Sequence, residues 1–250
     1  MSPLFILLLL SLRPEAAAGA EDRILTCGRC VEDQIDRLLQ ILQETENYFA
    51  SYRWAEAKIR WLYYEKLWAA RRQEADPLSK STRHQGEEEA ARLERELEDE
   101  EAMSLESSNG FVKKLEEFQN GHSLLEGCCP EKGFQECQQT AFRPAYEVLD
   151  QCKKAFDHIF EHEREYRKEV ALTSGEKEGL YPLDSLEKPE LHQEYYWRFE
   201  ADREEQRFRE NEEIAAYFWE ARNILNWDFA GKTCCTHCGV TEWEKKIEGL

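Results

Sequence analysis

The sequence predicts an all-α protein, an up-down bundle of four long helices with disulfides clustered at one pole. Glycine (12) and proline (7) are scarce among 250 residues, so the turn-rich composition of an all-β domain is missing. Apolar residues recur at three- and four-residue steps over long stretches. Eight of the nine cysteines fall near the ends of those stretches. This length and pattern predict one domain over residues 21–250.

Composition excludes two classes of protein. The chain carries 33 Lys and Arg against 52 Asp and Glu, a formal net charge of -19. Such a charge repels phosphate backbones, so we expect no nucleic-acid partner. Aromatic residues make up 12% of the chain, which is too many for a disordered acidic tail.

Residues 1–20 are typical of a secretory signal peptide. The apolar run from Leu4 to Leu12 is too short to span a bilayer, and the small residues Ala18-Gly19-Ala20 suit a cleavage site. No later apolar stretch approaches the roughly 20 residues of a membrane-spanning helix. We therefore expect a protein that is secreted or on the extracellular side of the membrane, or a shortened form of a longer membrane protein.

Two helices are predicted in the first half of the mature chain. Helical periodicity runs from Val31 to about Ala75 and stops before Asp76-Pro77, because the residue before a proline is pushed out of the α region. A second helix is predicted from Gly86 to Phe118, with a stop at Asn120-Gly121. The segment Ser107-Ser108-Asn109-Gly110 leaves open a break within it.

Two more helices are predicted after residue 140. The third spans about 141–172, with Pro144 in its first turn. Residues 173–188 are predicted to be a loop, and the fourth helix runs from Pro189 to about Phe229, with Gly231 just past its end. One face of the third helix collects a mostly apolar set: Leu149, Cys152, Phe156, Ile159, Phe160 and Glu163.

The cysteines give the strongest signal of architecture. In an up-down-up-down bundle, the start of the first helix, the second junction and the end of the fourth helix share one pole. We predict four disulfides among the eight cysteines of these segments, with the pairing left open. Cys152 lies about 22 Å from that pole and is predicted to be a free thiol. The eight are Cys27, Cys30, Cys128, Cys129, Cys137, Cys234, Cys235 and Cys238.

Metal and redox chemistry are the alternatives for these cysteines. The sequence contains two CxxC motifs, Cys27-Gly-Arg-Cys30 and Cys235-Thr-His-Cys238. Two such motifs together supply the ligands of a four-thiolate zinc site. Alternatively, one of the motifs is redox-active. Their separation of about two hundred residues and the secretory signal favour disulfides. We predict no metal and no cofactor.

One segment matches a zinc-hydrolase motif. His158-Ile-Phe-Glu161-His162 has the HxxEH pattern, in which two histidines bind zinc and the glutamate acts as base. At about 100° per residue from Phe156, all three polar side chains point away from the core. Solvated histidines on an acidic face are therefore the favoured interpretation, and no catalytic residues are predicted.

Trp54, Trp61 and Trp68 recur every seven residues in the first helix. They share a face that differs from the face of Ile35, Leu42 and Ile59. Burial against a neighbouring helix is one interpretation. If part of the row is exposed, it is a candidate partner-binding surface, because Trp is enriched at binding hot spots.

The layout resembles the ectodomains of the Izumo-like sperm–egg fusion proteins. The matching features are the signal peptide, Cys27-Gly-Arg-Cys30, a helical bundle, and Cys235-Thr-His-Cys238-Gly239 after the last helix. Cys128, Cys129 and Cys137 are additional to the family pattern. The resemblance implies a non-enzymatic adhesion module on gametes that binds a protein partner, such as a gamete surface receptor.

We therefore expect protein–protein recognition, in gamete adhesion or sperm–egg fusion if the resemblance holds. A secreted helical carrier or structural protein is the alternative, followed by a zinc-dependent hydrolase. A cavity lined by Phe and Tyr would favour the carrier, whereas a filled core with an exposed Trp would favour recognition.

Overall fold

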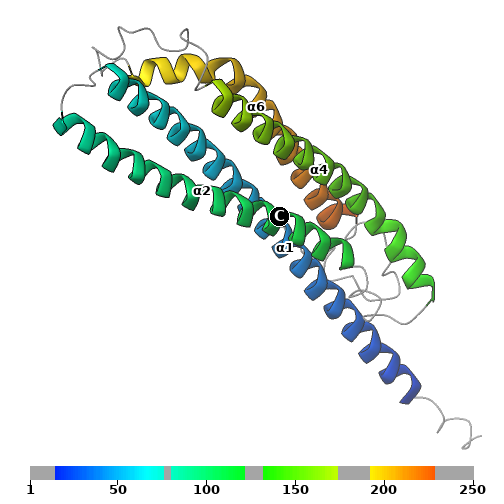
Figure 1. Ribbon diagram of the computed structural model, residues 1–250. Helices are drawn as coiled ribbons and strands as arrows, with labels where there is room; N and C mark the ends of the chain where they lie inside the picture. The colour runs from blue at the N-terminus through cyan, green and yellow to red at the C-terminus, as the bar shows by residue number, and fades with distance from the viewer. Residues whose placement is uncertain (1–14, 76–79, 122–131, 174–191, 229–250) are drawn as a thin grey trace, which may run out of the picture. The chain divides into compact units, whose positions relative to one another are not determined.

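The computed structural model describes residues 15–75, 80–121, 132–173 and 192–228. Side chains are described over 33–66, 68–69, 86–121, 143–167, 200–201 and 203–226. These residues contain no strand, and they form helices α1 (Glu15–Ala75), α2 (Lys80–Asn120), α4 (Lys132–Thr173) and α6 (His192–Asn223), followed by a π-helical turn, η3 (Ile224–Asp228) (Figure 1). The all-α prediction is confirmed.

The predicted C-terminal ends of the first two helices are correct. α1 ends at Ala75, directly before Asp76-Pro77, and α2 ends at Asn120. The backbone N–H of Gly121 donates to the carbonyl of Phe118 over 2.8 Å, which satisfies one of the acceptors that a helix end leaves free. Among the helices described, none is long and apolar enough to cross a membrane.

The predicted starts of three helices are wrong. α1 begins at Glu15 instead of Val31, α2 at Lys80 instead of Gly86, and α4 at Lys132 instead of 141. Apolar periodicity marks the part of a helix that packs, whereas alanine and polar residues of good helix propensity extend a helix beyond it. As a consequence, Cys27 and Cys30 lie inside α1 and Cys137 lies inside α4.

Pro144 is also placed differently from the prediction. It lies within α4, well after the first turn, so one backbone carbonyl of the preceding turn lacks its amide donor. α6 starts at His192, three residues after the predicted Pro189, and its helical path continues through η3 to Asp228. Pro189, Gly231 and nearly all of the loop predicted at 173–188 lie outside the described residues, except that Thr173 closes α4.

α2 continues without a break through Ser107–Gly110. A Cβ at Gly110 would lie 2.4 Å from Cδ1 and from Cε1 of Tyr48. The glycine therefore serves the close approach of α2 to α1 instead of a turn. Ser107 and Ser108 are buried, and the Ser108 hydroxyl donates to the carbonyl of Leu105 over 2.9 Å.

The packing divides the chain into two compact units, and every helix contributes to both. Unit 1 comprises residues 1–42, 116–148 and 219–250, and unit 2 comprises residues 43–115 and 149–218. In unit 1, Phe118 of α2 packs edge-on against Tyr146 of α4, with ring centroids 5.7 Å apart. Leu38 of α1 packs closely against Gly121, because a Cβ added at Gly121 would lie 2.6 Å from Cδ2 of Leu38.

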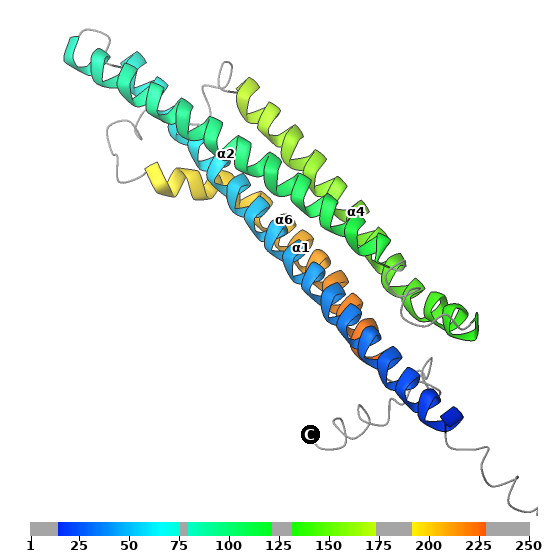
Figure 2. The ribbon, with the colours of Figure 1, turned by 90° about the horizontal axis from the view of Figure 1, so that it is seen from below.

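Unit 2 is held by an aromatic core to which all four helices contribute. Its segments of α1, α2, α4 and α6 run alongside one another in both views (Figures 1 and 2). Phe111 of α2 stacks on Phe156 of α4 with ring centroids 4.1 Å apart, and it also meets Phe218 of α6 at 6.3 Å. Tyr52 of α1 packs edge-on against Phe156 at 5.2 Å. These rings pack against one another in the centre of unit 2.

A second apolar cluster joins α1 to α2 within unit 2. It consists of buried residues from both helices, with Tyr63 packed against them: Ile59, Leu62, Ala69, Leu93 and Leu97. Between this cluster and the aromatic core the interior of unit 2 becomes polar.

Candidate functional site

The tryptophan row does not share one environment. Trp54 is 70% exposed, Trp68 is 8% exposed, and Trp61 is half-buried and stacked on Tyr64 with ring centroids 5.9 Å apart. Of the three residues, only Trp54 is fully exposed, so the row is exposed in part. A heptad step drifts by about 20° on a straight α-helix, and the residues around each position differ. Only Trp54 remains a candidate for contact with a partner.

The exposed face of α1 around Trp54 is uncharged. Between residues 43 and 54 every exposed side chain is neutral: Gln43, Asn47, Ala50, Ser51 and Trp54. The outer face of α4 in the same unit is dominated by charge, as at Lys154, Asp157 and Glu161. In a chain with 34% charged residues, this neutral strip on α1 is a local exception.

Phe208 of α6 lies beside the same part of α1 and is 60% exposed. Arg53, the residue before Trp54, donates from Nε to the side-chain oxygen of Asn211 over 2.8 Å and from Nη2 to the carbonyl of Arg207 over 3.1 Å. Phe208 follows Arg207 and is three residues from Asn211, so it lies on the same side of α6. Trp54 and Phe208 therefore flank one contact between α1 and α6.

The two helices present matching exposed stripes at this contact. On each helix the stripe has the spacing i, i+3, i+7, which places its three members on one face. All six residues are exposed and uncharged. We call this the Trp54–Phe208 surface, and its members are Asn47, Ala50 and Trp54 of α1 and Phe208, Asn211 and Ala215 of α6.

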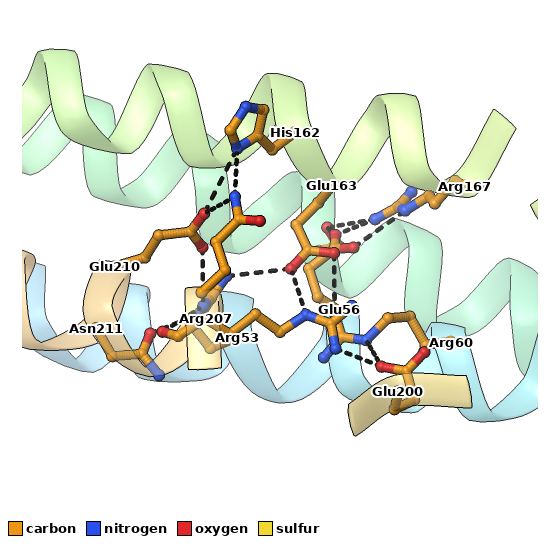
Figure 3. A network of polar contacts seen from close by, with 12 residues as sticks. Arg53, Glu56, Arg60, His162, Glu163, Arg167, Glu200, Arg207, Glu210 and Asn211 are labelled. Carbon is orange, nitrogen blue, oxygen red and sulfur yellow. Dashed lines mark hydrogen bonds and ion pairs between the residues drawn. The ribbon is translucent and has the colours of Figure 1, made fainter. Parts of the chain in front are cut away.

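Beneath this surface, unit 2 contains a network of buried ion pairs (Figure 3). Its centre is Glu163 of α4, whose side chain is 6% exposed. Its carboxylate contacts Arg53 at 3.1 Å, Arg60 at 2.9 Å and Arg207 at 3.4 Å. One α4 carboxylate thus binds two guanidinium groups of α1 and one of α6.

Three further carboxylates extend the network. Glu200 of α6 pairs with Arg207 and, at 3.3 Å, with Arg60, and it accepts a hydrogen bond from the Tyr166 hydroxyl over 2.5 Å. Glu210 contacts Arg53 at 3.2 Å. Glu56, the last of the three, pairs with Arg167 of α4 and accepts a hydrogen bond from the Ser104 hydroxyl of α2 over 2.6 Å.

The electrostatics of the network keep Arg167 and Arg207 charged. Burial disfavours the charged forms of Arg167 and Arg207, but neighbouring carboxylates outweigh burial and raise the pKa of both guanidinium groups. Burial, reinforced by Glu56 and Glu163, raises the pKa of Tyr52. Burial and Glu200 likewise raise the pKa of Tyr166. Arg167, Arg207 and Tyr166 therefore bind carboxylates of the network. The buried Tyr52 hydroxyl has no hydrogen-bond partner among the described residues.

The two histidines of the HxxEH segment lie on the outside of α4, as predicted. His158, Glu161 and His162 are all exposed. The histidine rings are 4.0 Å apart, and Nδ1 of His162 lies 3.0 Å from the Gln206 side-chain nitrogen and 3.5 Å from a Glu210 oxygen. Among the residues described, no group of three or more His, Cys, Asp or Glu side chains could hold a metal ion.

Cys152 is the one cysteine with a described side chain, and it is a buried free thiol. Burial, then Glu213 and Glu46, raise the pKa of Cys152 to about 12, so the reactive thiolate is negligible near neutral pH. The side chains of the eight cysteines predicted to form disulfides lie outside those described, and so does the predicted signal peptide up to residue 14.

Sequence reasoning missed Phe208 and the ion-pair network. The signal for the network was present, because Glu163 falls among apolar residues on the core face of the third helix. Phe208 stands alone in the charged run Arg207-Phe208-Arg209-Glu210, where no periodicity marks it. Comparison of the chain with family models, with curated proteins and with solved structures returned no match.

Proposed function

We propose that this protein is a non-enzymatic recognition module that binds a protein partner outside the cytoplasm. The single observation that supports this most is the exposure of Trp54, 70%, in the neutral strip of α1. A large indole left in water gains considerable free energy when a partner covers it, and Trp is enriched among binding hot spots. The resemblance to the Izumo-like proteins makes gamete adhesion or sperm–egg fusion the setting that we propose.

The core of unit 2 supports recognition over carriage of an apolar ligand. The rings that could line a cavity pack on one another, as Phe111 does on Phe156 at 4.1 Å and Phe49 does on Phe156 at 6.2 Å. A carrier would need that space for its ligand. The buried carboxylates of the network are likewise engaged with arginines of other helices, so recognition at the exterior fits these side chains better than catalysis in the interior.

We also propose the architecture that would present this surface outside the cell. It is an up-down four-helix bundle stapled at one pole by disulfides among Cys27, Cys30, Cys128, Cys129, Cys137, Cys234, Cys235 and Cys238. Residues 1–20 would direct the chain to the oxidising secretory pathway, where such bonds form. With a net charge of -19, the bundle gains from covalent links that oppose self-repulsion.

Partner capture tests the proposed function. The secreted full-length chain is immobilised, incubated with solubilised gamete membranes or somatic-cell membranes, and cross-linked, and bound proteins are quantified by mass spectrometry. We expect a gamete surface protein whose apparent affinity falls about 30-fold or more in Trp54→Ala, the effect of a hot spot worth at least about 2 kcal/mol.

Leu105→Ala is the matched control, because Leu105 of α2 is also exposed, at 57%, but belongs to another helix. It should leave capture unchanged. If every captured protein binds wild type and Trp54→Ala equally, the proposed function is wrong.

A further inference from the structure

We infer that the Trp54–Phe208 surface binds an amphipathic α-helix of a partner protein, with an apolar stripe flanked by lysine or arginine. This inference rests on the proposed function and specifies the chemistry of its partner. It follows from the shape of the surface, from its neutrality and from the charge at its rim.

The shape suits a helix lying along the contact between α1 and α6. In unit 2 the two helices are antiparallel, because Arg53 reaches Glu210 whereas Arg60, seven residues later, reaches Glu200. Each stripe offers small or short side chains at two of its three positions: Asn47 and Ala50 on α1, and Asn211 and Ala215 on α6. Small side chains let a third helix approach closely, and Trp54 and Phe208 then supply the large contacts.

The charges at the rim select a basic partner. Glu204 and Glu212 lie one helical turn before and after Phe208 on α6, and both are exposed. Glu205, also exposed, is already paired with Arg209. On α1 the stripe continues to the half-buried Lys58. The carboxylates of Glu204 and Glu212 therefore outnumber the single ammonium group of Lys58 at this rim. A partner with Lys or Arg beside its apolar stripe gains complementary charge across this rim.

The same charges disfavour a second copy of the chain as the occupant. Each copy carries a net charge of -19, and a two-fold contact would bring Glu204 and Glu212 of one copy towards the same acidic residues of the other. Like charges across an interface oppose association. A basic helix from another protein meets neither obstacle.

The test uses the full-length chain and three synthetic 18-residue peptides of defined chemistry. The first places leucine and alanine on one helical face and lysine on its flanks. The second replaces each lysine by glutamate, and the third has the composition of the first in scrambled order. Binding of labelled peptides is measured by fluorescence anisotropy at two salt concentrations. We expect the amphipathic lysine peptide to bind at least about tenfold more tightly than either of the other two peptides.

Variants locate the binding. Trp54→Ala and Phe208→Ala should each weaken binding of the lysine peptide about 30-fold, while Leu105→Ala changes it less than twofold. The double substitution Glu204→Gln, Glu212→Gln should weaken binding several-fold and reduce its salt dependence. Glu98→Gln, an exposed carboxylate on α2, is the matched control and should change neither. Circular dichroism establishes that each variant is folded.

Three outcomes would overturn the inference. The scrambled peptide binding as tightly as the amphipathic one would show charge attraction without helix recognition. Equal effects of Leu105→Ala and Trp54→Ala would show nonspecific apolar adhesion. Sedimentation showing wild-type dimers that Trp54→Ala converts to monomers would make a second copy the occupant. If membrane-protein capture depends on Trp54 but the lysine peptide does not bind, the inference fails alone; if capture ignores Trp54, the proposed function fails with it.

Discussion

Gly110 of α2 lies directly against the ring of Tyr48 of α1, at a distance that leaves no space for a methyl group. Gly110→Ala would place its Cβ 2.4 Å from two ring carbons, so the ring or the helix must move. Overpacking of this kind costs about 1–3 kcal/mol, against a gain of about 1 kcal/mol in helix propensity.

We therefore expect Gly110→Ala to lower the free energy of unfolding by up to about 2 kcal/mol, measured by urea denaturation. Asn109→Ala, at the exposed neighbouring position, should not destabilise. Adding Tyr48→Ala to the glycine variant should remove the clash. A more stable Gly110→Ala protein would contradict this description of the α1–α2 contact.

Glu163→Gln should strongly destabilise the protein. The substitution leaves Arg53, Arg60 and Arg207 around a neutral amide, and removing one partner of a buried ion pair typically costs about 3–5 kcal/mol. Thermal unfolding followed by circular dichroism measures the loss. Glu161→Gln, two residues earlier on the exposed face, removes only the surface pair with Arg164 and should cost less than about 0.5 kcal/mol. Similar effects of the two substitutions would refute a stabilising role for the network.

The stability of the protein should fall at alkaline pH through Cys152. Its pKa is raised from 9.0 to about 12 in the folded state, so between these values the unfolded chain releases a proton that the folded chain retains. Unfolding is then favoured as pH rises, by up to about 1.4 kcal/mol per pH unit. Between pH 8 and 10.5, wild type should lose up to about 2 kcal/mol more than Cys152→Ala. Parallel losses in both proteins would exclude this linkage.

Non-reducing peptide mapping tests the proposed disulfide pole. We expect four bridges that link different segments, with Cys152 recovered as the one alkylated thiol after denaturation. Adjacent Cys128 and Cys129 should bridge to different partners, because joining neighbours strains the intervening peptide. A bridge that includes Cys152, or Cys27 and Cys30 joined to each other, would show that the three junctions do not share a pole.

The purified, oxidised protein should contain no stoichiometric zinc. His158 and His162 face solvent, and thiols paired in disulfides do not bind metal. Inductively coupled plasma mass spectrometry gives the zinc content per chain. One equivalent of zinc that disappears in the double variant His158→Ala, His162→Ala would revive the hydrolase hypothesis and contradict the proposed function.

Local signals predicted the helices well where one residue type decides the outcome. Asp76-Pro77 and Asn120-Gly121 end α1 and α2 because proline and glycine act on the backbone directly. Gly110 shows the limit of such signals, since the same residue type permits either a turn or a close approach. Only the position of Tyr48 in space decides between them.

The candidate site was less predictable because it depends on contacts between helices. The heptad spacing of the tryptophans predicts a common face, yet it contains no information about which neighbours cover Trp68 and leave Trp54 in water. Phe208 becomes relevant only through the contact of Arg53 with Asn211, which joins residues far apart in the chain. Periodicity along one helix cannot reveal such pairs.

The ion-pair network of unit 2 also constrains how this sequence can change over time. Each of its carboxylates binds more than one partner, as Glu163 does with three arginines, so no single compensating substitution replaces all the contacts that are lost with one charge. Change at these positions must therefore occur in concert across α1, α4 and α6. In related sequences this predicts covariation of the whole set of charged residues, whereas the exposed Trp54 and Phe208 can diverge with their partner without disturbing that network.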